Sequence, residues 1–368
     1  MHIGIDAREL VGQRTGVGRY LENLCVEWLK LPPPTPHTFT LYGPASGNIS
    51  SALGRPFDSD PAEHFHYQSL PGPGGTLWEQ FNLASAINRN PPDVLFAPAY
   101  SCPLQIRIPV VLTIHDISFA THPEWFSWKE GLRRRWITRQ SATRAARVIA
   151  VSHFTKSELI ANFGLPSEQV SVIWSGVNPP LQYQTVPPRP LILYVGSIFN
   201  RRHIPELVRA FSRVSRRIPS AQLVLVGDNR SHPHQDPIQL AKAAGVSDRV
   251  TVKSYISEAE LTALYSQAMV FVFLSEYEGF GLPPLEAMAA GIPTVVGDTP
   301  VARELYHSAS RLVPVNDIPT IANHLITLLE NSQTRVALLK ASKALLDRFT
   351  WHRAASETLA LLEQAGSL

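Results

Sequence analysis

The strongest constraint on the fold is an alternation of short apolar runs with longer amphipathic stretches. The strand-length runs are His2–Asp6, Phe39–Tyr42, His66–Leu70, Val94–Ala97, Val110–His115 and Val148–Val151 in the first half, and Leu191–Val195, Leu223–Val226, Val250–Tyr255, Val270–Leu274, Thr294–Val296 and Leu312–Val315 in the second. Many are rich in Val, Ile and Leu and show little alternation with polar residues. Strands of this kind are buried on both faces, as in a parallel sheet covered by helices.

Helical periodicity fills the stretches between these runs. Apolar residues recur at three-to-four spacing in Gly18–Lys30, Ile204–Arg217, Glu258–Met269 and Pro319–Asn331. Repeated strand and helix in a chain of 368 residues predicts an α/β protein with two doubly wound, Rossmann-like parallel-sheet domains. The stretch Thr350–Gln364 is also helical by pattern, but periodicity does not assign it to either domain.

The joint between the domains is marked by residues 179–190, which contain five prolines. Proline continues neither a helix interior nor a sheet ladder, so this segment is predicted to be a linker. We place the first domain at residues 1–183 and the second at 184–351.

Composition excludes several classes of protein. The chain is 44% hydrophobic and 17% charged, which is the balance of a folded, soluble protein. A net charge of +3, from 33 basic and 30 acidic residues, is too even for a dedicated nucleic-acid binder. No apolar stretch reaches the roughly 18 residues of a membrane span, and the N-terminus lacks a signal-peptide pattern. We therefore expect a cytoplasmic protein, with Cys25 and Cys102 as ordinary thiols.

The clearest local motif runs from Ser275 to Glu286. It follows a buried run, contains Gly279 and Gly281, and continues into a predicted helix that begins near Pro283. A glycine loop before a helix N-terminus offers backbone N–H groups and a partial positive charge, which suit a phosphate. Glu278 and Glu286 flank the loop and would accept hydrogen bonds from sugar or ribose hydroxyls. The alternative is a tight turn whose glutamate only favours the helix dipole.

Two further motifs lie where a strand gives way to a helix. Residues 15–20 (TGVGRY) place Gly16 and Gly18 before the first helix, where backbone can approach a ligand closely. The alternative is a flexible turn. In residues 194–203, a strand ends at Gly196, and Arg201 and Arg202 follow at the expected mouth of the second domain. Guanidinium groups suit a diphosphate there, but solvated surface arginines are the alternative.

In the first domain, His115 and Asp116 follow a buried strand and are predicted to face a ligand. A structural histidine is the alternative. The stretch Trp125–Arg147 interleaves aromatic with basic residues. This pattern fits an anionic membrane surface or a charged acceptor, and the alternative is a solvated helix with its aromatics in the core. The candidates in this stretch are Trp125, Trp128, Arg133, Arg134 and Arg135.

Metal chemistry has no support in the motifs. The sequence lacks H-E-x-x-H, paired C-x-x-C and the P-loop pattern, so a dedicated metal site is not expected.

Taken together and in order, these motifs resemble those of family-4 glycosyltransferases. The resemblance rests on residues 4–8 (GIDAR), 15–20 (TGVGRY), 113–116 (TIHD), 151–159 (VSHFTKSEL), 194–196 (YVG) with Arg201 and Arg202, the pair Glu278 and Glu286 (E-x7-E) and residues 349–351 (FTW). It spans nearly the whole chain. It departs from the family pattern at Arg202, where lysine is common, and at His203, where asparagine is common.

The resemblance implies a GT-B fold, with two Rossmann-like domains facing each other across a cleft and a C-terminal helix (352–368) that crosses back to the first domain. It implies transfer of a sugar from a nucleotide diphosphate with retained anomeric configuration, without a metal or other cofactor. Glu286 would hold the ribose, Glu278 the sugar hydroxyls, and Arg201 with Arg202 the diphosphate. His115 would approach the donor sugar, with Asp116 beside it. These two residues, together with Arg201, Arg202 and Glu278, would be the catalytic residues. The remaining donor-site residues would be Gly16, Val17, Gly18, Gly196, Gly279, Phe280, Gly281 and Leu282.

The first expectation for the donor is GDP-mannose, with a UDP-hexose such as UDP-glucose as the alternative. The expected acceptor is a glycan or lipid-linked sugar, with peripheral contact at the inner face of the cytoplasmic membrane as a further expectation. A sugar-nucleotide epimerase, a non-enzymatic sugar-nucleotide-binding subunit and a nucleic-acid binder are the competing hypotheses. Intact Glu278 and Glu286 argue against the binding subunit, and the even charge balance argues against nucleic acid.

Overall fold

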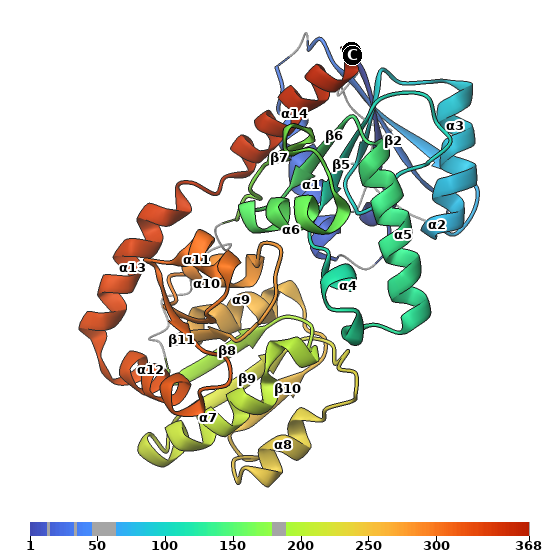
Figure 1. Ribbon diagram of the computed structural model, residues 1–368. Helices are drawn as coiled ribbons and strands as arrows, with labels where there is room; N and C mark the ends of the chain where they lie inside the picture. The colour runs from blue at the N-terminus through green and yellow to red at the C-terminus, as the bar shows by residue number, and fades with distance from the viewer. Residues whose placement is uncertain (13–14, 33–34, 46–63, 179–188, 368) are drawn as a thin grey trace. The chain divides into compact units, whose positions relative to one another are not determined.

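The chain folds into two compact α/β units. The computed structural model describes residues 1–12, 15–32, 35–45, 64–178 and 189–367 (Figure 1). Unit 1 is made of Met1–Gly176 together with Trp351–Leu368, and unit 2 is Val177–Thr350. The expected boundary between residues 183 and 184, and most of the predicted linker at 179–190, lie outside the described residues.

Unit 1 is built on a parallel sheet with the strand order β3-β2-β1-β4-β5-β6-β7. Its strands are β1 (His2–Asp6), β2 (Thr38–Pro44), β3 (Phe65–Leu70), β4 (Val94–Ala97), β5 (Val110–Ile114), β6 (Arg147–Ala150) and β7 (Val170–Val172). The sheet grows in one direction from β1 to β3 and in the other from β4 to β7. Such a switch point, at the carboxyl ends of the central strands, is where open α/β sheets bind ligands.

Helices cover both faces of this sheet because alternate strand residues point to opposite sides. Val94 and Phe96 of β4 join the core beneath α1 and α14, whereas Leu95 and Ala97 join the core beneath η2, α3, α5 and α6. The helical elements of unit 1 are η1 (Arg8–Leu10), α1 (Gly16–Trp28), α2 (Gly75–Leu77), η2 (Trp78–Leu83), α3 (Ala84–Arg89), α4 (Ser118–Thr121), η3 (Pro123–Trp125), α5 (Trp128–Arg144), α6 (His153–Phe163), η4 (Ser167–Gln169) and α14 (Trp351–Gly366).

The C-terminal helix α14 packs against the first helix of the chain. The indole Nε1 of Trp28 in α1 donates a hydrogen bond to the carbonyl oxygen of Ala355, at 3.0 Å. Leu361 and Leu362 of α14 belong to the same core as Leu24 of α1. The first and last α-helices of the described chain therefore share one hydrophobic layer.

Unit 2 repeats the doubly wound plan in the order β10-β9-β8-β11-β12-β13, again with parallel strands. Its strands are β8 (Leu191–Val195), β9 (Gln222–Val226), β10 (Val250–Lys253), β11 (Val270–Phe273), β12 (Thr294–Gly297) and β13 (Ser310–Val313). Its helical elements are η5 (Asn200–Arg202), α7 (Ile204–Arg217), α8 (Pro237–Ala243), α9 (Glu258–Gln267), α10 (Leu282–Ala289), α11 (Pro300–Tyr306), α12 (Ile318–Glu330) and α13 (Ser332–Leu346). The switch point of this sheet lies between β8 and β11.

The predicted fold class is confirmed, with two local corrections. Strand β7 was missed because Val170–Val172 is too short to show a pattern. The predicted loop at Gly16, Val17 and Gly18 is wrong, since these residues form the first turn of α1. The helix starts early because the Thr15 side chain caps it, accepting a hydrogen bond from the Gly18 N–H at 3.1 Å.

Candidate functional site

The loop between β11 and α10 carries the glycine motif of unit 2. It connects a buried strand to a helix with proline in its first turn, as predicted from the sequence. Gly281 precedes the helix with a φ of +84°, and a Cβ atom there would overlap the Tyr306 hydroxyl. That hydroxyl donates to the carbonyl oxygens of Phe280 and Gly281, at 2.8 and 3.0 Å. Tyr306 of α11 thus fixes the turn from behind, and only glycine fits beside it.

An ion pair links this loop to the arginine motif. Arg202 Nη1 lies 3.0 Å from Glu278 Oε1, and the two side chains are 10% and 18% exposed. Ser275 Oγ donates to the same carboxylate oxygen at 2.5 Å. The guanidinium carbon of Arg202 lies 4.3 Å from the ring centroid of Phe273. Arg202 is therefore held between an aromatic face and a carboxylate, and the solvated-surface alternative does not apply to it.

The Arg202 guanidinium retains unused donor capacity. Its Nε atom is buried and has no hydrogen-bond partner among the described residues. Buried donors are nearly always paired in native proteins, so an orphan on a cation indicates room for an anionic ligand or water. A phosphate oxygen has the charge and acceptor capacity to fill it.

Arg201 lies beside Arg202 in the 3-10 turn η5, directly before α7. Its guanidinium carbon is 4.4 Å from the Phe199 ring centroid, and its carbonyl oxygen accepts the Glu276 N–H at 3.0 Å. The latter bond ties η5 to the glycine loop. Gly196, at the end of β8, has a φ of +147° and leaves space next to Phe273. The structure therefore brings Gly196, both arginines and Glu278 to the carboxyl ends of β8 and β11.

His203 adds a histidine–carboxylate cluster that the sequence did not reveal. It adopts a left-handed conformation before α7, and its ring nitrogens lie 3.0 Å from Glu276 and 3.4 Å from Glu206. Burial lowers the pKa of His203, but hydrogen bonds and charge interactions with Glu206 and Glu276 outweigh it and raise the pKa above its ordinary value. The contact to Glu276 crosses from one loop to another, so no local pattern predicts it.

Glu286, Gly279 and Leu282 lie in or next to α10. Leu282 is the first residue of the helix and Glu286 follows one turn later, where its side chain is half-buried. Phe280 is buried and packs edge-on against Phe349, with ring centroids 5.7 Å apart. The proposed roles of Glu286, Gly279 and Gly281 as donor ligands stay predictions.

In unit 1, His115 and Asp116 follow β5 directly. His115 Nε2 lies 2.9 Å from the Pro98 carbonyl oxygen, and its ring meets Tyr20 edge-on at 5.0 Å. A carbonyl oxygen can only accept, so Nε2 carries the proton, and Nδ1 is the acceptor of the neutral ring. Burial lowers the pKa of His115, which favours this neutral form.

Asp116 has a structural role in addition to its predicted catalytic one. Its Oδ2 accepts from the Tyr100 hydroxyl at 3.0 Å, and its Oδ1 accepts from the Ser118 N–H at 2.9 Å and the Ser118 hydroxyl at 2.7 Å. The carboxylate thus holds the turn into α4, and its part in catalysis stays a prediction.

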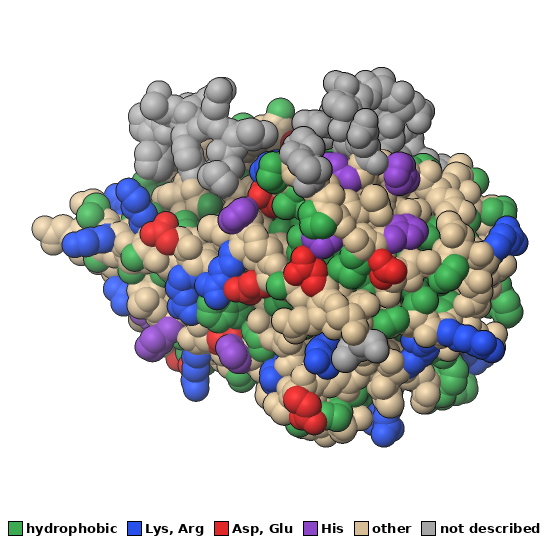
Figure 2. All heavy atoms as spheres, turned by 90° about the horizontal axis from the view of Figure 1, so that it is seen from above, with side chains coloured by type: hydrophobic (Ala, Val, Ile, Leu, Met, Phe, Trp, Pro, Cys, Tyr) green, Lys and Arg blue, Asp and Glu red, His purple; other side chains and the backbone are tan. Residues whose placement is uncertain are grey.

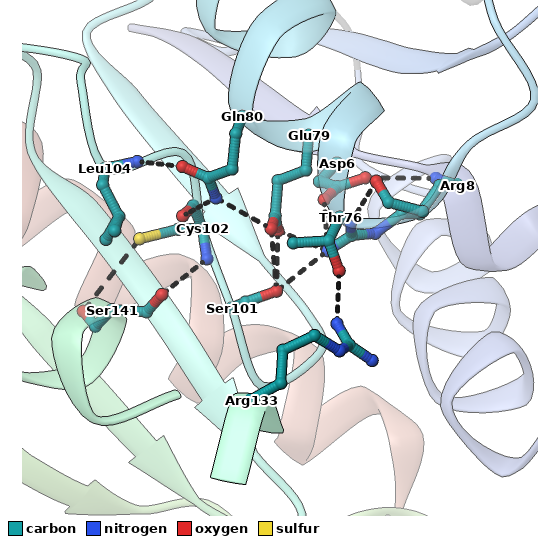
Figure 3. A network of polar contacts seen from close by, with 11 residues as sticks. Asp6, Arg8, Thr76, Glu79, Gln80, Ser101, Cys102, Leu104, Arg133 and Ser141 are labelled. Carbon is teal, nitrogen blue, oxygen red and sulfur yellow. Dashed lines mark hydrogen bonds and ion pairs between the residues drawn. The ribbon is translucent and has the colours of Figure 1, made fainter. Parts of the chain in front are cut away.

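A buried charge network stands at the carboxyl end of β1 (Figure 3). Arg8 pairs with Glu79 and, at 3.2 Å, with Asp6, while the Ser101 hydroxyl contacts both Glu79 oxygens at 2.8 and 2.9 Å. Burial raises the pKa of Asp6 to about 6; Arg8 acts in the opposite direction and Glu79 adds to the rise. The sequence analysis used Asp6 and Arg8 only as part of a motif, and it missed Glu79 altogether.

The aromatic residues of the stretch Trp125–Arg147 differ in their exposure. Trp125 is half-buried and stacks on His122, with ring centroids 4.0 Å apart. Trp128 and Trp136 of α5 are 73% and 57% exposed, so the alternative in which the aromatics point into the core fails for both. The basic candidates Arg133, Arg134 and Arg135 are also exposed on α5.

Within the described residues, no three His, Cys, Asp or Glu side chains gather as they would around a metal ion. The only cysteines, Cys25 and Cys102, are buried as free thiols.

Two doubly wound parallel-sheet units define a GT-B fold, and solved structures that match it include glycosyltransferases. HepE from Anabaena, solved with UDP and glucose, matches with a TM-score of 0.76 over 99% of this chain and 100% of its own, at 20% identity. WaaG, a glycosyltransferase involved in lipopolysaccharide biosynthesis, matches with a TM-score of 0.70 over 98% of this chain and 99% of its own, at 15% identity.

Family models identify the chain more closely. The model for glycosyl transferases group 1 matches residues 182–345, and the model for glycosyltransferase family 4 matches residues 14–180. Together the two models cover most of the chain, which belongs to the glycosyltransferases that they describe. This confirms the resemblance seen in the motifs.

Several curated relatives are named as mannosyltransferases. The O-antigen chain mannosyltransferase B of Escherichia coli is 25% identical over 68% of this chain and 68% of its own length. The O-antigen chain mannosyltransferase RfbU of Salmonella typhimurium is 30% identical over 56% and 57%. The GDP-mannose:cellobiosyl-diphosphopolyprenol alpha-mannosyltransferase of Xanthomonas oryzae is 29% identical over 66% and 64%. The last two are thus matched over less than two thirds of their own length.

Proposed function

We propose that this glycosyltransferase transfers mannose from GDP-mannose to a glycan or lipid-linked acceptor, with retention of anomeric configuration and without a metal. The observation that carries the proposal is the buried Arg202, paired with Glu278 at the switch point of unit 2 and left with an unpartnered Nε. The relatives named as mannosyltransferases support the sugar, and the Xanthomonas relative, named for GDP-mannose, supports the donor.

Arg202 and Arg201 would supply most of the charge stabilisation. Breaking the bond between the sugar C1 and the diphosphate oxygen leaves negative charge on the phosphate. Guanidinium groups fixed before the reaction stabilise that charge without reorganising, and the N-terminus of α10 adds to the effect. In this scheme a metal ion is not required for the leaving group.

The proposed transfer takes place on one face of the sugar. The C1–O bond to the diphosphate breaks, the acceptor oxygen bonds to C1 on the same face, and the acceptor proton moves to the departing phosphate oxygen. Glu278 is 18% exposed and would accept hydrogen bonds from hydroxyls of the transferred sugar. The double-displacement scheme with two carboxylates is not invoked, because Glu278 and Glu286 belong to one motif on the donor side.

His115 would act as a neutral hydrogen-bond acceptor for the donor sugar. With its Nε2 proton donated to Pro98, Nδ1 is the atom available to a sugar hydroxyl. The lowered pKa of His115 keeps this form dominant near neutral pH. Its proposed role is therefore binding and orientation, not proton transfer.

A UDP-hexose is the second candidate donor. HepE, which has this fold, was solved in complex with UDP-glucose. At 21% identity this likeness supports the fold, and it motivates including UDP-glucose in any donor test.

The test is a donor panel that contains GDP-mannose, UDP-glucose, UDP-N-acetylglucosamine, ADP-glucose and dTDP-rhamnose, with and without EDTA. A donor bound by the native state raises the melting temperature by mass action. We expect GDP-mannose to give the largest rise and to be hydrolysed slowly in EDTA, with release of the α-anomer. A larger rise in melting temperature with UDP-glucose than with GDP-mannose would assign UDP-glucose as the donor instead. A rise in melting temperature without hydrolysis would favour the binding-subunit alternative, and no response to any donor would overturn the assignment of these sugar nucleotides as donors. Activity lost in EDTA but restored by a divalent cation would overturn metal independence.

Arg202→Gln tests the site itself, with Arg217→Gln as the matched control. Arg217 is on α7 of the same unit, is 67% exposed and pairs with Glu330. We expect the hydrolysis rate to fall by a factor of about 100 or more in Arg202→Gln, the size seen when one preorganised charge-stabilising donor is removed. Arg217→Gln should keep the native rate. Equal rates in the two variants would contradict the assignment of Arg202.

A further inference from the structure

An exposed apolar surface bordered by basic residues lies on unit 1. Eight large apolar side chains are exposed in the described part of the chain, and five of them are on α2, η2 and α5. They are Leu77 (74% exposed), Phe81 (66%), Trp128 (73%), Leu132 (62%) and Trp136 (57%). We call these five residues, with Lys129, Arg133, Arg135 and Arg139, the α2–α5 face.

The orientation of α5 explains why its aromatics are exposed. Trp128, Leu132 and Trp136 follow at four-residue spacing, which places them on one side of the helix. The buried residues of the helix are on the opposite side: Gly131, Ile137, Thr138, Ser141 and Ala142. The apolar stripe therefore points to solvent while the rest of α5 packs on the sheet.

Side-chain contacts join α2 and η2 to α5. Arg133 Nη1 donates to Thr76 Oγ1 at 2.8 Å, one residue before Leu77 (Figure 3). Gln80 of η2 donates to the Cys102 carbonyl oxygen at 2.9 Å, and the Cys102 N–H donates to Ser141 Oγ of α5 at 3.1 Å. Figure 1 also shows α2 beside α5. The two sets of exposed apolar residues thus belong to one supported surface.

The charge around the stripe has one sign. By helix geometry, Lys129 and Arg133 border the stripe on one side and Arg135 on the other, and Arg139 follows at the next turn. The one acid of α5, Glu130, is paired with Arg134 at 2.7 Å. By contrast, on the face shown in Figure 2, basic side chains are interspersed with acidic ones and histidines. The border of the apolar stripe on α5 is therefore basic.

We propose that the α2–α5 face docks on an anionic bilayer surface. Exposed tryptophan, leucine and phenylalanine side chains enter the boundary between headgroups and acyl chains, and flanking lysine and arginine attract anionic lipids. No helix in the described residues has the length and apolar character to cross a membrane, so the contact is peripheral. The proposal does not depend on which sugar nucleotide is the donor.

Vesicle sedimentation of the full chain is the test, with phosphatidylcholine vesicles that contain or lack about a third of phosphatidylglycerol. We expect binding to the anionic vesicles that weakens with salt. Arg135→Gln/Arg139→Gln should lower the partition coefficient about fivefold per residue, which corresponds to ~1 kcal/mol per basic side chain near an anionic surface. Trp128→Ser/Trp136→Ser should abolish measurable binding.

The decisive pair is Leu77→Ser/Phe81→Ser, because these residues are outside α5. Loss of at least tenfold in partitioning is expected if α2, η2 and α5 form one surface. The matched control is Tyr255→Ser/Val336→Ser in unit 2, where the side chains are 78% and 65% exposed. This control should bind vesicles as the native chain does. Circular dichroism of each variant verifies that it is folded.

A measurement on the native chain avoids disruptive substitutions. Lipids brominated in the acyl chains should quench tryptophan fluorescence on vesicle binding, and Trp128→Phe/Trp136→Phe should bind with little quenching. Native binding equal to that of Leu77→Ser/Phe81→Ser would overturn the shared surface. Absence of vesicle binding would overturn the proposal that the face docks on a bilayer. A dimer or an oligonucleotide complex that Trp128→Ser/Trp136→Ser abolishes would then identify the occupant of the face.

Discussion

Gly281 and Tyr306 should respond to substitution as a coupled pair. The Tyr306 hydroxyl donates to the carbonyls of Phe280 and Gly281, and a Cβ atom on Gly281 would overlap it. Burial raises the pKa of Tyr306 well above its ordinary value, so the hydroxyl stays a donor across the accessible pH range. Removing the hydroxyl therefore deletes a bond and also makes space.

The magnitudes follow from these contacts. Tyr306→Phe removes the buried hydroxyl that donates to the carbonyl oxygens of Phe280 and Gly281, which costs about 1–3 kcal/mol. Gly281→Ala costs ~1 kcal/mol or more for the positive φ, plus about 1–3 kcal/mol for the overlap. In the double variant the overlapping atom is absent, and the next neighbour of the new Cβ, Tyr306 Cζ, is at 3.5 Å, an ordinary contact. The double variant should thus be about 1–3 kcal/mol more stable than the sum of the single effects predicts.

Amide hydrogen exchange of β11 is the assay, because its strand amides report the opening of unit 2 whatever the order in which the units unfold. Gly291→Ala is the matched control, since Gly291 has a φ of +71° and no atom within 4 Å of the new Cβ. Gly291→Ala combined with Tyr306→Phe should be additive within about 0.5 kcal/mol. Additivity for Gly281 as well would refute the reasoning, because it would mean that Tyr306 does not shape the turn.

Three further predictions concern unit 1. Gly18→Ala should destabilise α1 by about 1–3 kcal/mol, because a Cβ there would lie 2.5 Å from the Glu9 carbonyl oxygen, whereas Gly16→Ala has no such neighbour and should be neutral or stabilising in thermal unfolding. Asp6 has a folded pKa raised to about 6, so its contribution to stability is fully present below its unfolded pKa of 3.8 and is lost as the pH rises through 6. In urea unfolding, the free energy of unfolding of the native chain minus that of Asp6→Asn should therefore fall by up to about 3 kcal/mol between pH 4 and 7. A difference that does not change with pH would show that Asp6 is not buried as an acid. Trp28→Phe removes the bond to Ala355 and should accelerate amide exchange in α14 by about fivefold, the equivalent of ~1 kcal/mol, whereas unchanged exchange would contradict this anchoring of the helix.

Sequence patterns predicted those parts of the fold and the site that depend on neighbouring residues. The runs at Val94–Ala97 and Leu191–Val195 have the bounds of β4 and β8, because an unbroken apolar run needs no distant information. The sequence shows that Arg202 follows β8 after a short loop, but its pairing with Glu278 requires β8 and β11 to be neighbours in the sheet. Strand order is a long-range property, and the sequence analysis did not predict it.

The missed residues share that dependence on distant contacts. Tyr306 contacts Gly281 from a helix 25 residues further along the chain, and Glu79 meets Arg8 across 71 residues. The sequence analysis did not single out Leu77 and Phe81, whose exposure depends on how α2 and η2 pack on the sheet. The error at Gly16 has a different origin, because glycine weakens a helix on average and the Thr15 cap overrides that preference locally.

The pairing of α1 with α14 sets an order of events during synthesis. Unit 2 is one continuous segment, Val177–Thr350, whereas unit 1 contains two segments separated by all of unit 2. The contact between Trp28 and Ala355 spans 327 positions. On the ribosome, unit 2 can complete its fold before residues 351–366 are available. Until then the apolar side of α1, with Leu24 and Trp28, lacks the helix that covers it. The half of the enzyme that is made first is therefore the half that finishes folding last, and in that interval its open face is the surface that chaperones would encounter.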